Sequence, residues 1–526
     1  MSERTSWSRV ILGFATALVV GAALGSVVQT QVNLIALLGL DVEIGIGTWL
    51  ATTLEDLLKF GPVYLVMFGV SFLVSQIVAM VGTRFVLTSW RTPVCALAAA
   101  VGLWATFKLV DHLAPPPTLI AATRDVGGML AMLASAAIAG WLFARMATGR
   151  SGARRHPGAA AVLALVTLLG FPDGEVRAET VDSYRVETVV SGLEHPWSLA
   201  FLPDGGMLVT ERPGRLRRIT PDGELDPEPV SGVPEVLLGG QAGMFEVSLA
   251  PNFGDSRMLY LSYACGTVQA NHTCLARARL EGSELRDLEE IFRARPAKVG
   301  TAHYGGRIAW LPDGTLVLSL GDGFDYREEA QRLSSHIGTL VRLRPDGTVP
   351  PDNPFVDDPD ALPEIYSYGH RNVQGLVYDD AGERLIAHEH GPRGGDEINV
   401  IEPGANYGWP VATHGLDYTW ARVTPYTEYP GTEPPRLHWT PSIAPSGMAL
   451  YTDDRFPRWR GDLLVGGLVT RAVHRVEPGS GDATERERLF GEQGERIRDV
   501  RTGPDGSVYL LTDSPEGRLL RVTPQQ

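Results

Sequence analysis

Four uninterrupted apolar stretches in the first third of the chain restrict its fold more than any other feature. They lie at about residues 10–29, 61–82, 92–112 and 127–144. Each is long enough to cross the ~30 Å hydrocarbon core of a bilayer as an α-helix. A shorter fifth stretch covers residues 158–171. The remainder of the 526 residues is polar, acidic and rich in Gly and Pro. We therefore expect a transmembrane helical domain of four to five helices over residues 1–174 and a separate domain over residues 183–526.

Charges between the apolar stretches predict how the chain crosses the bilayer. The arginines on one side are Arg4, Arg9, Arg84, Arg91, Arg145, Arg150, Arg154 and Arg155. The opposite segments carry Asp41, Glu43, Glu55, Asp56, Asp111 and Asp125, with Arg124 as their one arginine. By the positive-inside rule the N-terminus is cytoplasmic and everything after residue 171 lies outside. This pattern predicts a multi-pass protein of a bacterial inner membrane with its C-terminal domain in the periplasm.

The fifth stretch has two interpretations. It has a basic flank, an apolar core and a small-residue ending at Ala178, which together are typical of a signal peptide, here internal. We favour a retained fifth helix over cleavage. Lys108, Asp111 and His112 also have two interpretations at the end of the third stretch. They could line a quinone or proton site, although charges at a helix end usually just mark the membrane interface.

From about residue 183 a short unit recurs, in which two apolar strands flank a turn built on Pro-Asp-Gly or its relatives. Pro presets the turn and Gly accepts a positive φ, so each unit predicts a β-hairpin. The six units are LAFLPDGGMLVTE, SLAPNFGDSRMLYLSYA, IAWLPDGTLVLSLGD, LVYDDAGERLIAHEH, MALYTDDRFPRWRGDLLVGG and VRTGPDGSVYLLTD. Their number and spacing favour an all-β, six-bladed β-propeller over a solenoid or a sandwich. Loops at one end of its channel would bring distant residues into one site.

Charge and cysteine content restrict partners and compartment. The formal net charge of −15 argues against nucleic acid as a partner. Cys265 and Cys274 flank a loop between two strand-like segments. They could form a hairpin disulfide in an oxidising compartment, or they could be two free thiols.

The stretch TAHYGGRIAWLPDGTLVLSLGDG, residues 301–323, places His303 at what reads as the start of a strand. The predicted turn returns the chain so that Asp322 comes back beside His303. An imidazole with a carboxylate partner is suited to moving a proton near neutral pH.

Other segments are rich in groups that bind an anionic, planar ligand. Guanidinium groups would pair with its carboxylates, amides would bond its edge and an aromatic ring would stack on its face. The residues concerned are Gln241, Arg371, Asn372, Gln374, Trp439, Arg496 and Arg498.

Six motifs occur in order across residues 190–522. They are GGQAGMFEVSLAPNF, HYGGRIAWLPDGTLVLSLGD, YSYGHRNVQGL, HGPRGGDEINVIEPGANYGWP, WTPSIAPSGM and IRDVRTGPDGSVYLLTD. Through these motifs the region resembles the glucose/sorbosone dehydrogenase family. Its members are soluble quinoprotein aldose sugar dehydrogenases that bind pyrroloquinoline quinone (PQQ) on a six-bladed propeller.

The resemblance implies an oxidoreductase that oxidises the C1 hydroxyl of an aldose to a lactone, with PQQ and Ca²⁺ as cofactors. His303 would be the general base and Asp322 would orient it. Gln241, Arg371, Asn372, Gln374, Arg496 and Arg498 would contact PQQ, and Trp439 would line the sugar or cofactor face. The carbonyls of Gly391 and Pro392 would bind the calcium at PQQ, and Glu397 and Tyr407 match positions that hold a further calcium. Electrons would leave to a membrane quinone or a cytochrome.

This chain departs from the family pattern in two respects. Val469 stands where soluble glucose dehydrogenases place a lysine against a PQQ carboxylate, unless Arg471 or a nearby group replaces it. The helical part, which would lie in the lipid bilayer, is absent from the soluble relatives. Two alternatives are a calcium-dependent propeller lactonase, which gives no reason for the arginine set, and a non-catalytic propeller that binds sugar or protein. The sequence identifies neither the sugar nor the oligomeric state.

Overall fold

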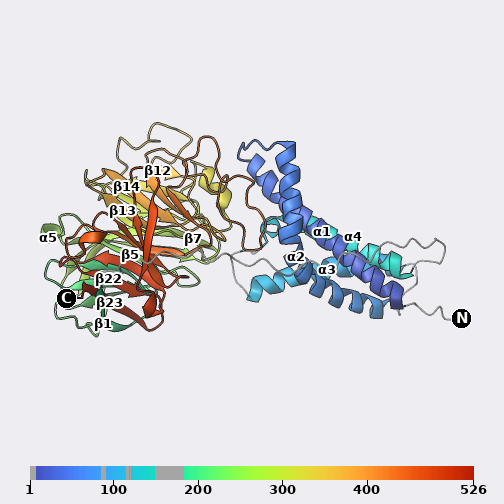
Figure 1. The fold of residues 1–526 in the computed structure, drawn as a ribbon, viewed down its shortest axis with the longest axis horizontal. Coiled ribbons are helices and arrows are strands. Elements are labelled where there is room, and N and C mark those ends of the chain that lie inside the picture. Colours follow the sequence, from blue (N-terminus) through green and yellow to red (C-terminus); the bar gives the residue numbers. More distant parts are fainter. Residues whose placement is uncertain (1–6, 84–89, 114–117, 119, 149–182, 526) are drawn as a thin grey trace.

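The computed structural model describes residues 7–83, 90–113, 118, 120–148 and 183–525. A helical part lies at one end of the molecule and a β-rich part at the other (Figure 1). The predicted fifth apolar stretch and Ala178 lie outside the described residues.

The helical part consists of four long helices: α1 (Trp7–Leu38), α2 (Ile46–Gly82), α3 (Arg91–Leu113) and α4 (Val126–Thr148). All four are long and apolar enough to cross a membrane. Helix α2 begins well before the predicted start at residue 61, because Glu55, Asp56 and Lys59 interrupt the apolar pattern without interrupting the helix. Asp56 is buried and accepts a hydrogen bond of 2.8 Å from the Thr30 hydroxyl of α1.

An aromatic stripe on α2 holds the helices together. Phe60, Tyr64, Phe68 and Phe72 recur every four residues, so they lie on one helix face, and successive rings stack 5.2–5.8 Å apart. On α1 the stripe faces small residues, where a Cβ on Gly25 would come 2.1 Å from the Tyr64 ring. Small residues let membrane helices approach closely, and here they make room for the rings.

The β-rich part has six sheets, of which five have four strands and one has three. Five blades follow each other along the chain. The first has β2 (Pro196–Phe201), β3 (Met207–Glu211) and β4 (Arg215–Ile219), and the second has β5 (Met244–Leu249), β6 (Met258–Thr267), β7 (Ala270–Glu281) and β8 (Glu284–Arg293). The third has β9 (Ile308–Trp310), β10 (Leu316–Ser319), β11 (Thr339–Leu343) and β12 (Ile365–Tyr368), the fourth has β13 (Val373–Asp379), β14 (Arg384–Glu389), β15 (Asp396–Ile401) and β16 (Leu437–Trp439), and the fifth has β17 (Pro445–Leu450), β18 (Leu463–Gly467), β19 (Ala472–Glu477) and β20 (Thr484–Leu489). The propeller also has the short helices α5 (Phe253–Ser256), η3 (Arg327–Gln331), η4 (Pro457–Trp459) and η5 (Gly491–Gln493), whereas η2 (Ala121–Thr123) lies between α3 and α4.

The sixth blade joins the two ends of the propeller. Strand β1 (Tyr184–Leu193) pairs with the C-terminal strand β23 (Gly517–Pro524), next to β22 (Val508–Thr512) and β21 (Ile497–Thr502). Five of the six hairpins predicted from the sequence form the first two strands of the five preceding blades. The last predicted hairpin forms β21 and β22 of the sixth blade. The predicted six-bladed propeller with an N-terminal helical part is therefore confirmed.

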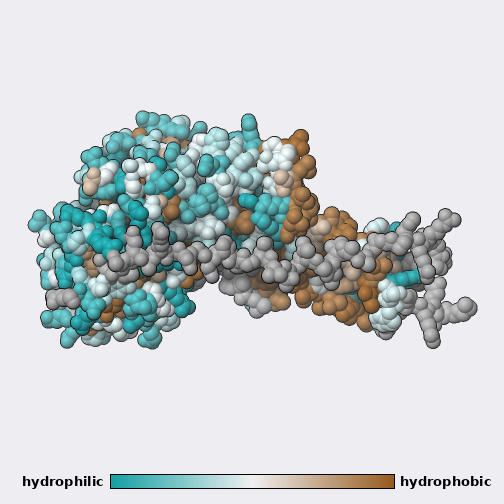
Figure 2. Space-filling model, viewed as in Figure 1, coloured by the Kyte–Doolittle hydropathy of each residue, from teal (hydrophilic) through white to brown (hydrophobic). Residues whose placement is uncertain are grey.

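The helical part packs directly on the propeller. The Arg422 guanidinium donates two hydrogen bonds, of 2.8 and 3.0 Å, to the Glu55 carboxylate, and its backbone N–H donates to Asp56. An apolar cluster beside this contact joins Leu34, Leu37 and Val42 to Val411, Tyr426 and Tyr429. Figure 2 shows that the exposed surface of the helices is largely hydrophobic, whereas that of the propeller is largely hydrophilic.

Candidate active site

His303 and Asp322 form a buried pair in the propeller. Nδ1 of His303 lies 2.6 Å from Oδ1 of Asp322, and the two residues are 3% and 0% exposed. Oδ1 also accepts a hydrogen bond of 2.8 Å from the Phe324 backbone N–H, and Oδ2 accepts one of 2.8 Å from the Trp409 indole. The carboxylate is thus fixed on both oxygens. Among the described residues no group bonds Nε2 of His303, and neither His303 nor Asp322 is among the residues that line the cavities described below.

The predicted strand start at His303 is not what the structure shows. His303 has a φ of 44° and lies in a loop that ends where β9 begins at Ile308. Glycines on both sides allow this loop to approach the segment after β10. A Cβ on Gly305 would come 2.5 Å from the Ser319 carbonyl oxygen, and one on Gly321 would come 2.5 Å from the His303 carbonyl carbon. Gly305 of HYGG and Gly321 of GDG are therefore required for the two segments to touch.

Electrostatics keep the pair in the form of a neutral base and an anionic carboxylate. Burial lowers the pKa of His303 below its usual value, and the Arg371 charge lowers it further, while Asp322 opposes both. Burial alone would raise the pKa of Asp322, but the interaction with His303, which includes their hydrogen bond, and the Arg371 charge outweigh it, so the pKa lies below the usual range. At neutral pH the imidazole can therefore accept a proton.

A cavity of about 330 Å³ adjoins the pair and contains most of the predicted ligand-binding residues. Its lining includes Gln241, Asn372, Gln374, Arg496 and Arg498. Gln241 connects it to the pair by accepting a hydrogen bond of 2.8 Å from the His303 backbone N–H. The cavity thus offers carboxamides and two guanidinium groups beside a base.

The two cavity arginines share one partner. Arg496 and Arg498 donate to Oδ2 of Asp513 over 3.1 and 2.9 Å. This pairing holds the pKa of the Asp513 carboxyl below its usual range despite burial. Val469 also lines the cavity and is 63% exposed. Arg471 is absent from this lining and donates to the Gly494 carbonyl, so it does not replace the family lysine.

Two predicted residues lie elsewhere. Trp439 is buried between blades and donates its indole N–H to Glu485, and it is not among the residues that line the cavity. Arg371 lies on the other side of the pair, where its guanidinium donates 2.7 Å to the Gly391 carbonyl and lies 5.3 Å from the Trp409 ring centroid.

Three of the four predicted metal ligands meet at one small cavity, which Gly391, Glu397 and Tyr407 line together with Glu389. Burial and the Glu389 charge raise the pKa of Glu397 well above its usual range. Pro392 lines a neighbouring cavity with Phe324 and Arg371. The Tyr407 hydroxyl donates 2.7 Å to the Val400 carbonyl, so a cation here would use the backbone oxygen of Tyr407.

Several neighbours of the pair were not predicted from the sequence. Trp409 and Phe324 contact Asp322 directly, and the Phe324 ring lies 5.2 Å from the His303 ring. Lys298 lies 3.5 Å from the centroid of the Tyr304 ring, and burial lowers its pKa to about 7. His390, which is half-buried, lines the large cavity, and desolvation lowers its pKa to about 3. His390 begins the motif HGPRGGDEINVIEPGANYGWP, which was the one sequence signal for this residue.

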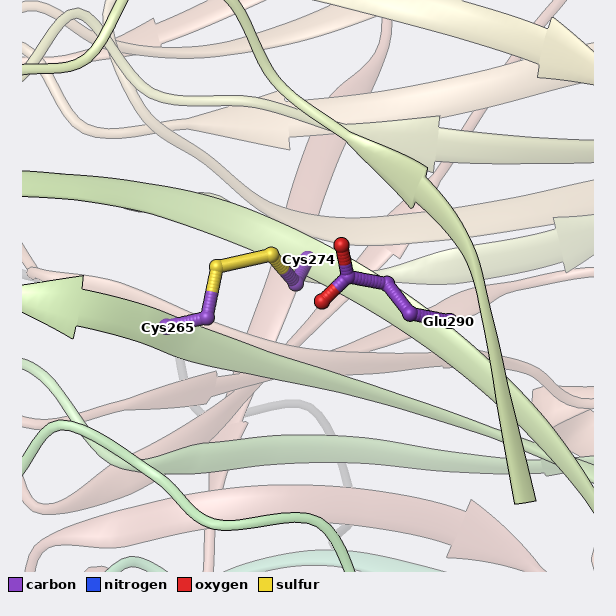
Figure 3. Close-up of side chains that lie close together, drawn as sticks. All are labelled: Cys265, Cys274 and Glu290. Carbon is purple, nitrogen blue, oxygen red and sulfur yellow. A yellow bond between two sulfur atoms is a disulfide. The ribbon is translucent and has the colours of Figure 1, made fainter.

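Cys265 and Cys274 form a disulfide between β6 and β7, and Glu290 lies beside it (Figure 3). This trio is the one metal-like cluster of His, Cys, Asp and Glu side chains among the described residues. Because its sulfurs are bonded to each other and Glu290 pairs with Arg293, it is not a metal site.

The fold and the site define a β-propeller enzyme whose histidine–aspartate pair borders a cavity suited to an anionic ligand. The chain belongs to the glucose/sorbosone dehydrogenase family, whose sequence model matches residues 193–521. It is 43% identical to the aldose sugar dehydrogenase YliI of Escherichia coli over 65% of this chain and 93% of that relative.

Two solved structures agree with this assignment. A crystal structure of a glucose dehydrogenase is 46% identical, with a TM-score of 0.63 over 65% of this chain and all of that one. The PQQ-bound form of an aldose sugar dehydrogenase from Streptomyces coelicolor is 30% identical, with a TM-score of 0.53 over 65% of this chain and 99% of that one. The expected family and the expectation of a sugar dehydrogenase are therefore confirmed.

Proposed function

We propose that this chain is a membrane-anchored aldose dehydrogenase that depends on PQQ and Ca²⁺ and oxidises the C1 hydroxyl of an aldose to the lactone. The observation that carries the proposal is the buried His303–Asp322 pair beside a cavity lined by arginines and carboxamides. A calcium-dependent lactonase would not need this arginine set.

The cavity residues fit a planar tricarboxylate such as PQQ. Arg496 and Arg498 would neutralise its carboxylates, and they are already oriented by Asp513. Gln241, Asn372 and Gln374 would bond its polar edge, and Arg371 would lie at the end nearer to Gly391. Since Val469 is uncharged, one carboxylate of PQQ would have a weaker partner here than in the soluble glucose dehydrogenases.

Calcium fits the oxygen-rich backbone beside Arg371. The carbonyls of Gly391 and Pro392 would hold one ion at the cofactor, and Glu397 with the backbone of Tyr407 would hold a second. Hard oxygen ligands suit Ca²⁺, and a divalent ion would relieve the repulsion between half-buried Glu397 and buried Glu389.

The chain's own residues would supply the acid–base chemistry. Asp322 fixes Nδ1 of His303, so Nε2 removes the proton from the C1 hydroxyl of the sugar, and the carboxylate stabilises the imidazolium that forms. Bound PQQ supplies a hydride acceptor at its quinone carbon C5. Burial keeps the base neutral at pH 7, which favours the reaction.

The four apolar helices support anchoring in a bacterial inner membrane, with the helical domain at residues 1–174 and the propeller at 183–526. The Cys265–Cys274 disulfide supports a periplasmic propeller, because disulfides persist in oxidising compartments. Electrons would pass from the cofactor to a membrane quinone or a cytochrome.

Reconstitution tests this function. The full chain, extracted in detergent and treated with a chelator, receives PQQ, Ca²⁺ and an artificial electron-accepting dye. We expect aldose-dependent dye reduction that requires both cofactors. Lactone hydrolysis without dye reduction, or no reaction with any aldose, would contradict the proposal.

A further inference from the structure

A further cavity, of about 180 Å³, lies where the helical part meets the propeller. Helices α2 and α3 form its apolar wall with Phe60, Val63 and Phe107. Its polar wall has Asp111 at the end of α3, Thr123 in η2 and Thr419 on a propeller loop. A cavity with aromatic walls and a few polar groups at one end is typical of a small-molecule site.

The position of the cavity relates it to the membrane. Val63 is 43% exposed on α2, among residues that the bilayer would cover. The Asp111 side chain is 43% exposed and pairs with Lys108 over 3.4 Å. The cavity therefore has one side toward lipid and another at the water interface, as a molecule with an apolar tail and a polar ring requires.

Two ring contacts connect this cavity to the candidate active site. The Phe324 ring lies 5.2 Å from His303 and 6.0 Å from Tyr418, on which it stacks. Tyr418 immediately precedes Thr419, which lines the cavity. The polar end of the cavity is thus linked to His303 through the Tyr418 and Phe324 rings.

Polar contacts fix the helical part to the propeller segment that carries Phe324. Thr118 donates to the Asp325 carboxylate through its backbone N–H and its hydroxyl, over 3.2 and 3.1 Å. Arg124 pairs with Glu328 at 3.5 Å. Asp325 follows Phe324 directly, so the segment that carries the stacking ring is also the one fixed to the helical part.

We propose that the cavity binds the ring of an isoprenoid membrane quinone, which accepts the electrons of sugar oxidation. This inference rests on the proposed function and names its electron acceptor. The two electrons and two protons taken from the sugar reduce the quinone to the quinol, which restores the oxidised cofactor. The Thr123 and Thr419 hydroxyls donate to the Ile120 carbonyl and the Asp417 carboxylate, so their oxygens, like the Asp111 carboxylate, can accept a hydrogen bond from a quinol hydroxyl. The isoprenoid tail would leave past Val63.

Photolabelling tests the site without any turnover. The full chain without PQQ is placed in lipid nanodiscs with an azido-ubiquinone analogue and irradiated, and the labelled residues are mapped by mass spectrometry. We expect labels at cavity residues of α2 and α3 or near Thr419. In Val63→Trp the new ring fills the cavity, so labelling should fall at least tenfold. Val66→Trp is the matched control, because Val66 is 67% exposed on α2 but does not line the cavity, and its labelling should stay at the wild-type level.

Activity provides the second measurement. The rate of sugar-dependent reduction of a short-chain ubiquinone is measured and divided by the rate of dye reduction in the same preparation. This ratio should fall at least tenfold in Val63→Trp and in Thr419→Trp, which fills the cavity from the propeller side, but not in Val66→Trp. Equal labelling of the wild type and all variants overturns the inference. This result would show that the analogue does not bind in the cavity, for example because a lipid acyl chain occupies it. An unchanged ratio does so too, because the acceptor then binds elsewhere or is a cytochrome. Failure of dye reduction alone would instead contradict the proposed function.

Discussion

The Trp409 indole N–H donates a hydrogen bond of 2.8 Å to Oδ2 of Asp322, from a position 87 residues further along the chain. It leaves Oδ1 for His303, so a loop from another blade sets the orientation of the carboxylate. The geometry of the base is therefore a property of the assembled propeller and not of one hairpin.

Replacing Asp322 by Asn tests whether the carboxylate orients and stabilises the base. An amide cannot stabilise the imidazolium, so we expect kcat for dye reduction to fall by about 10²- to 10⁴-fold, the usual contribution of a positioned acid–base group. PQQ affinity, measured by titration, should be unchanged. Trp409→Phe removes one hydrogen bond and keeps the charge, so its loss should be much smaller. Equal losses in the two variants would show that Asp322 has only a structural role.

The lowered pKa of His303 predicts how activity depends on pH. The base works when neutral, so kcat should stay constant around pH 7 and fall on acidification, with a midpoint below the usual histidine value of 6.5. Arg371 lowers this pKa, so Arg371→Gln should move the midpoint to higher pH when PQQ is saturating. A shift to lower pH, or none, would contradict the assignment of the acidic limb to His303.

Calcium removal should affect stability as well as activity. Without the ion, Glu397 has a raised pKa in the folded chain, so the folded state binds more protons than the unfolded state. The melting temperature of the chelated protein should therefore decrease as the pH rises above the usual Glu range. Added Ca²⁺ should remove this dependence, and Glu397→Gln should weaken it in the chelated protein. The same melting curve with and without Ca²⁺ would argue against a site at Glu397.

The disulfide predicts a measurable stability difference. A bond that closes a loop of nine residues should contribute about 2–3 kcal/mol in the chain-entropy account. Replacing both Cys265 and Cys274 by Ser should lower the melting temperature of the propeller by several degrees and leave kcat unchanged. Labelling of both thiols in membranes isolated without reductant would contradict the expected oxidising compartment.

The local chemistry of the sequence was sufficient to predict the hairpins but not their neighbours. Pro-Asp-Gly turns and alternating apolar residues specify β9 with β10 without reference to the rest of the chain. The contacts of Trp409 and Phe324 with Asp322 depend on how blades and loops assemble, and no spacing in the sequence encodes them. Trp439 shows the converse, because an aromatic residue in a ligand-like motif serves the packing between blades.

The start of α2 was harder to predict for a similar reason. The apolar pattern places the start of α2 after the charged residues Glu55 and Asp56. In the structure both carboxylates accept hydrogen bonds from Arg422 of the propeller and belong to the helix. Their partners lie hundreds of residues away, so the first turns of α2 were missed.

Reduction of bound PQQ by sugar in a single turnover tests the central claim most directly. The full chain is loaded with PQQ and Ca²⁺, and the cofactor absorbance is followed after mixing with an aldose or with the same aldose deuterated at C1. We predict rapid reduction by the unlabelled sugar, slower reduction by the deuterated sugar, and none in His303→Ala, which should still bind PQQ. The exposed His438→Ala serves as the control and should behave as wild type. Reduction at the wild-type rate in His303→Ala, or no absorbance change with any aldose in the wild type, would contradict the account.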